Sequence, residues 1–308
     1  MIQLNNEFIH TLEEIMRKYI GEIMLCITAI IWGSGFVVSA IALEHYTPYQ
    51  ILAGRFLVGF LILSLIFYKK LKGVNKGIII KGFVLGFFLY LAFALQTVGL
   101  QYTTPSKNAF LTAVNVVIVP FIAFFAYKRK IDKFELTGAI LAIIGIGFLS
   151  LQFSTDINVG DVLSLACAVA FAYQIFYTAK YVKDEDPITL TIVQMFFAAF
   201  FSWLVVLFTG EMSFSFETEA VASILYLAAF STTLAFLFQT IAQKFTNETK
   251  AAIILSTESF WGMVFSVILL SEILTARMVI GAILILCAIM ISETKLSFLK
   301  RKSVEKLT

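Results

Sequence analysis

Charged residues are scarce in this sequence. Asp, Glu, Lys and Arg make up only 14% of its 308 residues, whereas apolar residues make up 60% and the mean hydropathy is +0.92. Soluble domains carry about 25% charged residues. A soluble chain this apolar would leave much of its surface adhesive, so the composition excludes a soluble domain and indicates an integral membrane protein. The net charge of +3 is too small to indicate a nucleic-acid partner.

Cysteine and histidine are scarce as well. The three cysteines, Cys26, Cys167 and Cys287, all fall in apolar stretches, and the two histidines, His10 and His45, lie outside those stretches. A cysteine in such a stretch is typical of a small buried apolar side chain rather than of a disulfide or a metal ligand. The histidines show no spacing that would pair them as metal ligands. We therefore expect no disulfide framework, no metal site and no cofactor.

The sequence also lacks the motifs of ATP hydrolysis and of common membrane enzymes. It contains no GxxxxGKS/T loop, no HExxH and no GxSxG motif. These motifs supply nucleotide binding, zinc chemistry and a nucleophilic serine, respectively. No catalytic residue is predicted. An enzyme embedded in the membrane is therefore a minor alternative, as is a channel or a receptor.

What the sequence does contain is a series of long apolar runs. A helix needs about 20 apolar residues to cross the hydrocarbon core of a bilayer. Ten runs meet or approach this length, at 22–43, 49–68, 78–100, 107–127, 134–151, 161–179, 188–209, 220–242, 251–271 and 275–292. The connections between them are too short for a soluble domain, and a helix satisfies its own backbone hydrogen bonds in lipid. The sequence therefore predicts an all-α integral membrane protein with ten transmembrane helices.

Lysine and arginine are divided unequally between the two sides of this bundle. The side with both termini carries 20 of the 23 basic residues, the other side carries Lys107 and Arg277, and Arg55 lies within a span. The positive-inside rule then predicts that both termini are cytoplasmic and that the protein lies in the cytoplasmic membrane. Residues 1–20 lack the basic start and apolar core of a signal peptide, so we expect an amphipathic cytoplasmic segment there. Residues 294–308 are expected to form a basic cytoplasmic tail.

The two halves of the sequence resemble each other. "GEIMLCITAIIW" at 21–32 aligns with "GDVLSLACAVAF" at 160–171, and this offset of 139 also pairs Pro48 with Pro187. From Thr103 the offset is 143, which pairs Thr103 with Thr246, Lys107 with Lys250, Ala109 with Ala252, Gly138 with Gly281 and Ala139 with Ala282. Each repeat, 21–151 and 160–293, holds five spans, and because five is odd the second repeat is inverted. Inverted repeats around a central site are the architecture of many secondary transporters.

Several segments resemble the EamA-like branch of the drug/metabolite transporter superfamily. They are "AIIWGSGFV" in the first span, "AGRFLVGFLIL" in the second, "GLQYTTPSKNAFLTAVNVVIVPFIAFFAYKRK" through the fourth and "STESFWGMVFSVILLSEIL" in the ninth. The resemblance covers about 21–293. It implies a ten-helix bundle with a central cavity that moves small metabolites or drugs across the cytoplasmic membrane. One residue departs from the family pattern. Ser259 follows Glu258 where many relatives have proline, which favours a straighter ninth helix.

Polar residues inside the spans are the candidate site, because an ionised side chain there costs about 2.5–3.5 kcal/mol on insertion scales. Glu258 is the only acid or base from Ala251 to Ser271, and its counterpart under the offset of 143 is Asn115. Arg55 lies at a similar depth in the second span, and its counterpart under the offset of 139 is Gln194. Two symmetry-related polar pairs near the midplane predict a binding site at the repeat interface.

Each candidate has a functional and a structural interpretation. Glu258 could carry a proton or bind a cationic substrate group, since burial disfavours the charged form of a carboxyl group. Alternatively, it accepts hydrogen bonds from Ser256 or Thr257. Arg55 could bind a carboxylate or phosphate, or it could pair with backbone carbonyls. The remaining candidates could line a cavity or pack between helices, and they are Gln96, Gln174, Gln194, Gln239, Trp32 and Trp261. Glu272, between the last two spans, is expected to be solvated.

The leading hypothesis is a secondary transporter that exports a small organic solute by alternating access, driven by protons or by substrate exchange. The alternative is an antiporter of nucleotide sugars or sugar phosphates from the same superfamily. Its phosphates would require at least two Lys or Arg inside the membrane, and only Arg55 is clearly there. The expected partners are a small-molecule substrate and the lipid bilayer, without nucleic acid. Coupling to protons and assembly into a homodimer stay open alternatives.

Overall fold

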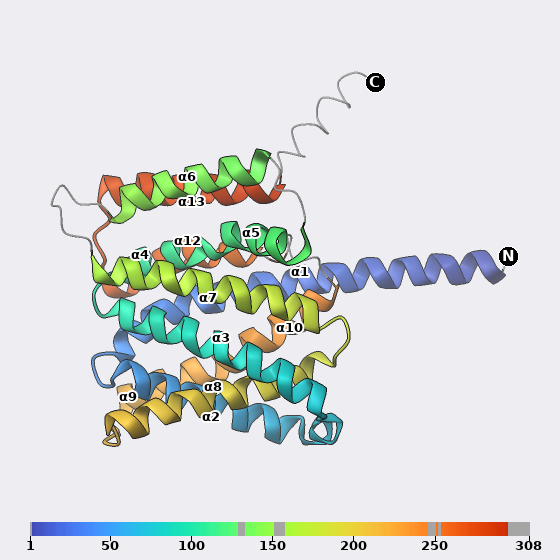
Figure 1. The fold of residues 1–308 in the computed structure, drawn as a ribbon, viewed down its shortest axis with the longest axis horizontal. Coiled ribbons are helices and arrows are strands. Elements are labelled where there is room, and N and C mark those ends of the chain that lie inside the picture. Colours follow the sequence, from blue (N-terminus) through green and yellow to red (C-terminus); the bar gives the residue numbers. More distant parts are fainter. Residues whose placement is uncertain (1, 129–132, 151–157, 246–250, 252–253, 295–308) are drawn as a thin grey trace.

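The computed structural model describes residues 2–128, 133–150, 158–245, 251 and 254–294, and every regular element among them is helical (Figure 1). The α-helices are α1 (Ile2–Ala42), α2 (Pro48–Ile66), α3 (Lys76–Leu100), α4 (Pro105–Ala113), α5 (Asn115–Tyr127), α6 (Lys133–Ser150), α7 (Val159–Tyr181), α8 (Pro187–Thr209), α9 (Thr218–Tyr226), α10 (Ala235–Phe245), α12 (Glu258–Leu270) and α13 (Ala276–Thr294). Two further stretches are a 3₁₀ helix, η1 (Tyr68–Gly73), and a π-helical segment, η2 (Leu227–Leu234).

Ten helical segments within the described ranges are apolar enough to lie in a bilayer. Seven are long enough to cross it, namely Tyr19–Ala42, Pro48–Ile66, Lys76–Leu100, Pro105–Ala126, Val159–Tyr181, Pro187–Thr209 and Thr218–Phe245. Three are shorter, namely Leu136–Phe148, Ile254–Leu270 and Ala276–Ile291. The prediction of an all-α membrane protein with ten transmembrane helices is confirmed. α1 begins well before its span and projects beyond the bundle (Figure 1), and the membrane-surface role of residues 1–20 stays a prediction.

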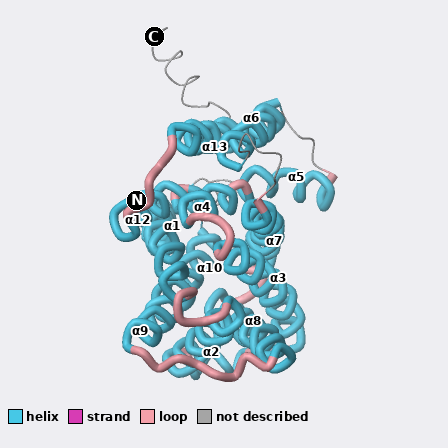
Figure 2. Tube along the Cα trace, turned by 90° about the vertical axis from the view of Figure 1, so that its left-hand side faces the viewer, coloured by secondary structure: helices cyan, strands magenta, loops and turns pink. Residues whose placement is uncertain are grey.

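The helices pack in the pattern that an inverted repeat requires. α1 of the first repeat packs against α10 and α12, and its counterpart α7 packs against α3 and against α4 and α5. α2 packs against its own counterpart α8 and α6 against α13, whereas α4 of the fourth span packs against α12 of the equivalent ninth span. Figure 1 shows α6 and α13 side by side as an outer layer, and Figure 2 shows the same pair from the end of the bundle. This is the packing expected around a pseudo-two-fold axis in the membrane plane.

The connections before equivalent helices use the same capping chemistry. Thr47 and Gln50 form a reciprocal capping box at the start of α2, whose first residue is Pro48. In the second repeat, Asp186 caps the start of α8, whose first residue is Pro187. Proline fits at this position because the first N–H groups of a helix have no partner within the helix. The two repeats therefore share the N-terminal capping of α2 and α8 as well as the order of their helices.

Two glycines allow helices to approach each other closely. A Cβ added at Gly86 of α3 would lie 2.5 Å from the Cβ of Phe197 on α8, and one added at Gly33 of α1 would lie 2.4 Å from the Cβ of Trp261 on α12. Both distances are far below the van der Waals contact distance of two carbon atoms. A larger residue at either position therefore requires the helices to move apart. Small residues at helix crossings are a common means of association in lipid, where burying apolar surface gives little driving force.

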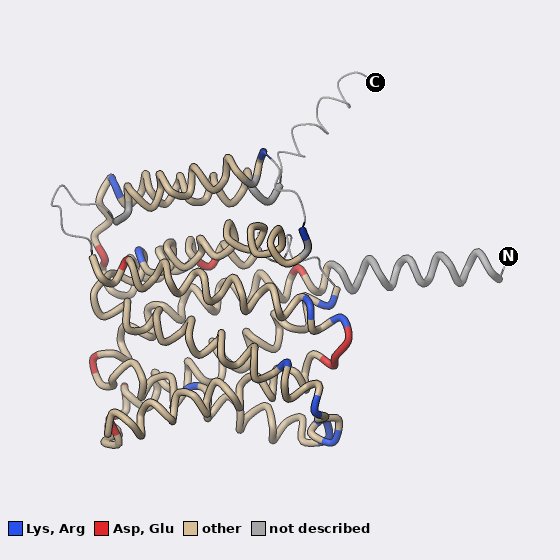
Figure 3. The backbone as a smooth tube through the Cα atoms, viewed as in Figure 1, with Lys and Arg blue, Asp and Glu red and all other residues tan. Residues whose placement is uncertain are grey.

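The two ends of the bundle differ in charge. We call the end with Tyr19 and η1 the terminal end, and the end with the α1–α2 and α8–α9 connections the opposite end. Figure 3 shows Lys and Arg gathered at the terminal end, whereas Asp and Glu predominate at the opposite end. At the terminal end, Lys70 of η1 forms an ion pair with Asp186 at 2.8 Å. The charge asymmetry of the sequence is therefore an asymmetry between the ends of the folded bundle.

At the opposite end, Glu272 links α4 and α12 by hydrogen bonds rather than lying free in solvent. Its Oε2 accepts hydrogen bonds from the Ser106 hydroxyl at 2.8 Å, from the Ser106 backbone N–H at 3.3 Å and from the Ser266 hydroxyl. Ser106 is in the first turn of α4, where unpaired N–H groups attract a negative charge. The expectation of a solvated Glu272 is wrong, because α4 and α12 meet closely enough to share its carboxylate.

Candidate functional site

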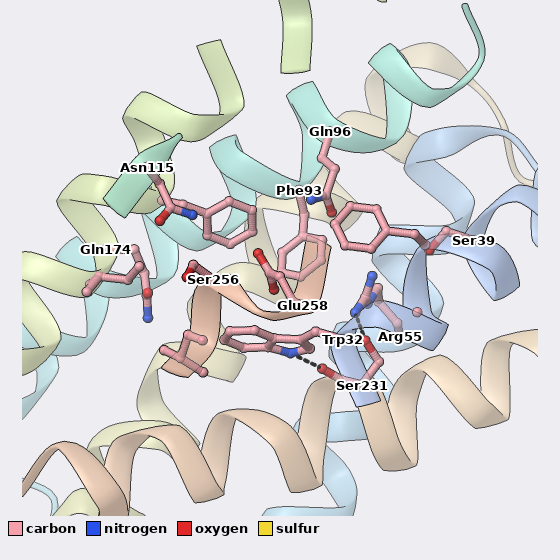
Figure 4. Close-up of a pocket in the computed structure, with 15 residues that line it drawn as sticks. Trp32, Ser39, Arg55, Phe93, Gln96, Asn115, Gln174, Ser231, Ser256 and Glu258 are labelled. Atoms are coloured by element: carbon pink, nitrogen blue, oxygen red, sulfur yellow. Dashed lines mark hydrogen bonds between the residues drawn. The ribbon is translucent and has the colours of Figure 1, made fainter. Parts of the chain in front are cut away.

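A cavity lies in the middle of the bundle, between the two repeats (Figure 4). Its walls come from α1, α2, α3, α5, α7, η2, α12 and the helical residues 254–256 that precede α12. The empty volume is about 550 Å³, but only about 30 Å³ of it is open to the centre of a water molecule. One water needs roughly 10–15 Å³ measured in this way, so the cavity holds about two or three waters. A solute larger than a few waters therefore fits only if this cavity widens.

Two spans are interrupted at the level of the cavity, at equivalent positions of the two repeats. The fourth span breaks at Val114, between α4 and α5, and the ninth breaks at Thr257, just before α12. These positions are 143 residues apart, which is the repeat offset. The residue after the first break is Asn115, and the residue after the second is Glu258. Both of these polar residues line the cavity from the start of a helix.

The break at Thr257 contradicts the expectation of a straighter ninth helix. Although no proline follows Glu258, the Thr257 hydroxyl donates to the Ile254 carbonyl at 2.7 Å, and the Ser259 hydroxyl donates to the Ser256 carbonyl at 2.8 Å. Hydroxyl groups that bond to carbonyls of the preceding turn compete with the backbone ladder and often bend helices. Serine and threonine therefore interrupt this helix in the absence of proline.

The Glu258 carboxyl group faces the cavity and has no partner among the residues that the structure describes. The residue is 7% exposed, and among the described residues it takes part in no hydrogen bond and no ion pair. The Thr257 hydroxyl does not bind it, because that hydroxyl donates to the backbone. Asn115 is 5% exposed and likewise leaves its Oδ1 without a hydrogen bond in the described part of the chain. Two polar groups at equivalent positions are thus available to water or to a solute.

Arg55 lies on the cavity wall and is anchored to η2. It is 1% exposed, its Nε donates to Thr232 Oγ1 at 2.8 Å, and its Nη2 donates to Ser231 Oγ at 3.1 Å. The guanidinium carbon lies 4.2 Å from the centre of the Phe93 ring, which is the geometry of a cation–π contact. The Trp32 indole N–H donates to the Ser231 carbonyl at 3.0 Å (Figure 4). π-Helical segments such as η2 are rare and often occur at functional sites.

Arg55 and Gln194 do not act as a matched pair. Arg55 finds two hydroxyl groups on η2, whereas the equivalent positions of α3 hold Phe88 and Leu89. Gln194 is 0% exposed, its amide has no hydrogen-bond partner within the described ranges, and it does not line the cavity. Arg55 thus lines the cavity, whereas its repeat counterpart Gln194 does not, although the two occupy equivalent backbone positions.

Among the other glutamine candidates, two line the cavity and one does not. Gln96 and Gln174 line the cavity, and each donates to a threonine hydroxyl, at 3.2 Å and 3.0 Å respectively. Gln239 does not line it, and its amide is fully buried without a hydrogen-bond partner among the described residues. The structure therefore brings Gln96 and Gln174 together with Glu258 and leaves Gln239 outside the cavity.

Aromatic rings from both repeats form an apolar wall. The rings of Trp32 and Phe236 lie 5.0 Å apart between centres, and those of their counterparts Phe171 and Phe93 lie 5.1 Å apart. Phe93 also meets Phe236, its own counterpart, at 6.0 Å. Trp32 lies on the cavity wall, whereas Trp261 does not and packs at the crossing of α1 with α12.

The sequence contains a signal for this wall beyond the candidates identified from polarity. "AFALQTV" at 92–98 and "AFLFQTI" at 235–241 share Ala, Phe, Gln and Thr at the offset of 143. The offset therefore already applies at residue 92 rather than from Thr103. Extending the repeat in this way pairs Phe93 with Phe236 directly.

Both halves of the chain match one family of membrane transporters. The EamA-like transporter family matches residues 19–151 and again residues 158–294. The chain belongs to the EamA-like transporter family. It is therefore a multi-pass membrane transporter with two EamA repeats, and not an enzyme.

Proteins similar to this EamA-like chain bear transporter names as well. An uncharacterized transporter of Archaeoglobus fulgidus is 36% identical over 91% of this chain and 87% of its own length. The uncharacterized transporter YyaM of Bacillus subtilis is 26% identical over 87% of this chain and 92% of its own length. A crystal structure of a protein superposes with a TM-score of 0.68 over 91% of this chain and 98% of its own, at 12% identity. At that identity the structure shows a shared fold alone.

Proposed function

We propose that this EamA-like protein is a secondary transporter that exports a small organic solute across the cytoplasmic membrane by alternating access. The observation that carries the proposal is the position of Asn115 and Glu258, which follow equivalent helix breaks and line one nearly closed central cavity. A solute bound there contacts both repeats. Movement of one repeat against the other would therefore expose it to the two sides of the membrane in turn.

Glu258 is the proposed coupling group. A carboxyl group inside the membrane without a pairing partner is costly, and such residues commonly mark ion or substrate pathways. In one part of the cycle Glu258 would take up a proton, or it would bind a cationic group of the solute directly. Asn115 would hydrogen-bond the solute from the other repeat. Trp32 and Gln96 would contact its apolar and polar parts.

The cavity chemistry favours a small organic solute over a nucleotide sugar or a sugar phosphate. Arg55 is the only Lys or Arg that lines the cavity among the described residues. Its guanidinium is already engaged by two hydroxyl groups and by the Phe93 ring. A diphosphate would need a second cation to compensate its charge on leaving water. The aromatic wall instead suits a solute with a substantial apolar part.

The proposed orientation places the terminal end in the cytoplasm. Lys and Arg gather at that end (Figure 3), and basic residues are retained on the cytoplasmic side of membrane proteins. Both termini would then be cytoplasmic. Glu272 and the α8–α9 connection would face the outside.

A ligand screen followed by a transport assay tests the function. Purified protein is screened by thermal shift against amino acids, amines, nucleosides and drugs, because a ligand that binds the native state raises the unfolding temperature. Each stabilising solute is then measured for movement into sealed proteoliposomes, with and without a pH gradient. Saturable movement that stops when the protein is omitted supports a transporter. Chemical conversion of the solute, or ion currents at channel rates, would contradict it.

Glu258→Gln distinguishes the possible roles of the carboxyl group, because glutamine keeps the shape and removes titration. If a proton is coupled, the variant should lose accumulation driven by a pH gradient and keep solute exchange. If Glu258 binds a cationic group, both activities and the affinity should fall. The matched control is Glu44→Gln, at an exposed position in the α1–α2 connection, which should transport like the parent. A Glu258→Gln variant with the parent's pH dependence and affinity would remove Glu258 from the mechanism.

A further inference from the structure

Gln239 of α10 has a buried amide with no hydrogen-bond partner in the described part of the chain. It is 0% exposed, and neither its Oε1 nor its Nε2 is hydrogen-bonded within the described ranges. Leaving a buried amide unpaired costs about 1–3 kcal/mol. Gln243, one turn further along the same face, likewise has an amide without a hydrogen bond to any described residue. A persistent cost of this kind is understandable if the amide acquires a partner in another state of the protein.

Gln239 is the repeat counterpart of Gln96, which lines the cavity. Both glutamines occupy the same place in the paired segments 92–98 and 235–241. α3 runs from the terminal end to the opposite end, so Gln96, near its last turn, lies toward the opposite end. α10 ends at the terminal end, so Gln239 lies toward that end. The cavity in this structure reaches Gln96 and does not reach Gln239.

Gln96 and Gln239 differ in the hydrogen-bond partners that surround them. The side-chain amide of Gln96 donates to the Thr112 hydroxyl at 3.2 Å, and the Gln96 backbone carbonyl accepts from the Asn108 side chain at 3.1 Å. The repeat counterparts of Thr112 and Asn108 are Leu255 and Ala251, which are both buried and apolar. The first repeat therefore restrains its glutamine, whereas the second supplies no such partner to the equivalent amide.

We propose that Gln239 contacts the solute in the state that opens toward the terminal end. This rests on the proposed function, because it requires alternating access. When inverted repeats exchange their arrangements, each residue moves to the place in the fold that is equivalent to its counterpart's, while its side-chain neighbours remain those of its own repeat. Gln239 then moves onto the cavity wall, and Gln96 becomes enclosed. Since no side chain at the equivalent positions restrains Gln239, its N–H and C=O groups can bind a hydroxyl, amide or carboxyl group of the solute.

A thiol at position 239 reports this exchange if the opposite end can be locked. The native cysteines are first replaced, namely Cys26, Cys167 and Cys287. Ser106→Cys and Ser266→Cys are then introduced, because both hydroxyls bind one oxygen of Glu272 and a disulfide there would join α4 to α12. Protein in lipid nanodiscs carries Gln239→Cys in addition. It is oxidised or kept reduced, and labelling with the small anionic reagent sulfonatoethyl methanethiosulfonate is compared with that of the same protein without Gln239→Cys, which gives the share of the thiols at 106 and 266.

The lock should raise the labelling rate of Gln239→Cys by about tenfold, because a protein whose opposite end is held closed can open only toward the terminal end. Gln96→Cys should be labelled more slowly under the same lock. Thr240→Cys is the matched control, since Thr240 is 1% exposed at the same depth on a neighbouring face of α10, and it should stay unlabelled. A Gln239→Cys rate no higher than that of Thr240→Cys overturns the inference.

Parallel transport measurements separate this inference from the proposed function. If the parent transports the solute and Gln239→Cys stays inert, the inference fails and the function stands. If the parent transports nothing and the lock changes nothing at position 96, the proposed function fails.

Gln239→Leu gives a second measurement that does not depend on labelling. Leucine removes two unpaired polar atoms with little change in size, so the unfolding temperature should be unchanged or higher. Apparent affinity for the solute from the terminal side should fall about tenfold, the equivalent of one lost hydrogen bond. A loss of stability, or an unchanged affinity, would show that Gln239 has a packing role only.

Discussion

Replacing Arg55 with methionine should detach α2 from η2, and the structure sets the size of the effect. The guanidinium makes two hydrogen bonds to hydroxyl groups, at 2.8 and 3.1 Å, and one cation–π contact with Phe93. Hydrogen bonds to a charged group contribute about 1.5–3 kcal/mol each, and a desolvated cation–π contact about 2 kcal/mol. Removing the buried charge recovers part of this, because the cost of keeping it out of water disappears. The stability of the single variant alone is therefore a poor measure of the anchor.

A double-mutant cycle isolates the contact between Arg55 and Thr232. Arg55→Met, Thr232→Val and the double variant are unfolded in mixed detergent micelles, and the coupling energy is obtained from the four free energies of unfolding. We expect a coupling of about 1.5–3 kcal/mol. Thr233→Val is the matched control, because its hydroxyl is directed to the Gly59 carbonyl at 3.5 Å, and it should not couple to Arg55. A coupling below about 0.5 kcal/mol for Thr232 would refute the anchoring of Arg55 by η2.

Three further outcomes are expected. Gly33→Ala should lower the free energy of unfolding by about 1–3 kcal/mol, measured in the same micelles, because its Cβ would lie 2.4 Å from that of Trp261; an unchanged value would mean that α1 and α12 do not touch there. Burial works to raise the pKa of the Asp186 carboxyl, but hydrogen bonds from Lys70 and from the start of α8 together lower it. A lowered pKa stabilises the fold fully above the unfolded-state value of about 3.9 and less as the pH falls below it, so the difference in unfolding temperature between the parent and Asp186→Asn should shrink below about pH 4; a constant difference would contradict this. Reporter enzymes fused to either terminus should be active only in the cytoplasm, and external activity would reverse the proposed orientation.

The architecture could be predicted from the sequence because it depends on patterns that single residues carry directly. Apolar runs of the right length define the spans, and the offsets of 139 and 143 between equivalent residues define the inverted repeat. The same offset brings Asn115 and Glu258 together as candidates, and both line the cavity. The depth of a residue in its span and its position in the repeat follow from its place along the backbone. They can therefore be predicted without knowing which side chains it contacts.

What could not be predicted depends on side-chain partners across helices. The break at Thr257 arises from hydroxyl groups that bond to local carbonyls, which composition alone does not reveal. Gln194 has the position predicted for a site residue, but the helix facing it differs from the one that faces Arg55. Glu272 belongs to a connection by sequence, yet it binds the start of α4 because two distant spans meet there. The repeat symmetry thus predicts the backbone position of a residue but not the contacts that its side chain makes.

The most direct test of the central claim is protection of a thiol at position 115 by the transported solute. Asn115→Cys, in protein without native cysteines, is treated with sulfonatoethyl methanethiosulfonate in the presence and absence of the solute found by thermal shift. We predict that the thiol is labelled and that the solute slows the labelling. Val116→Cys should stay unlabelled, because Val116 is 1% exposed in the apolar core. An inert thiol at position 115, or labelling that the solute leaves unchanged, would contradict the placement of the substrate in this cavity.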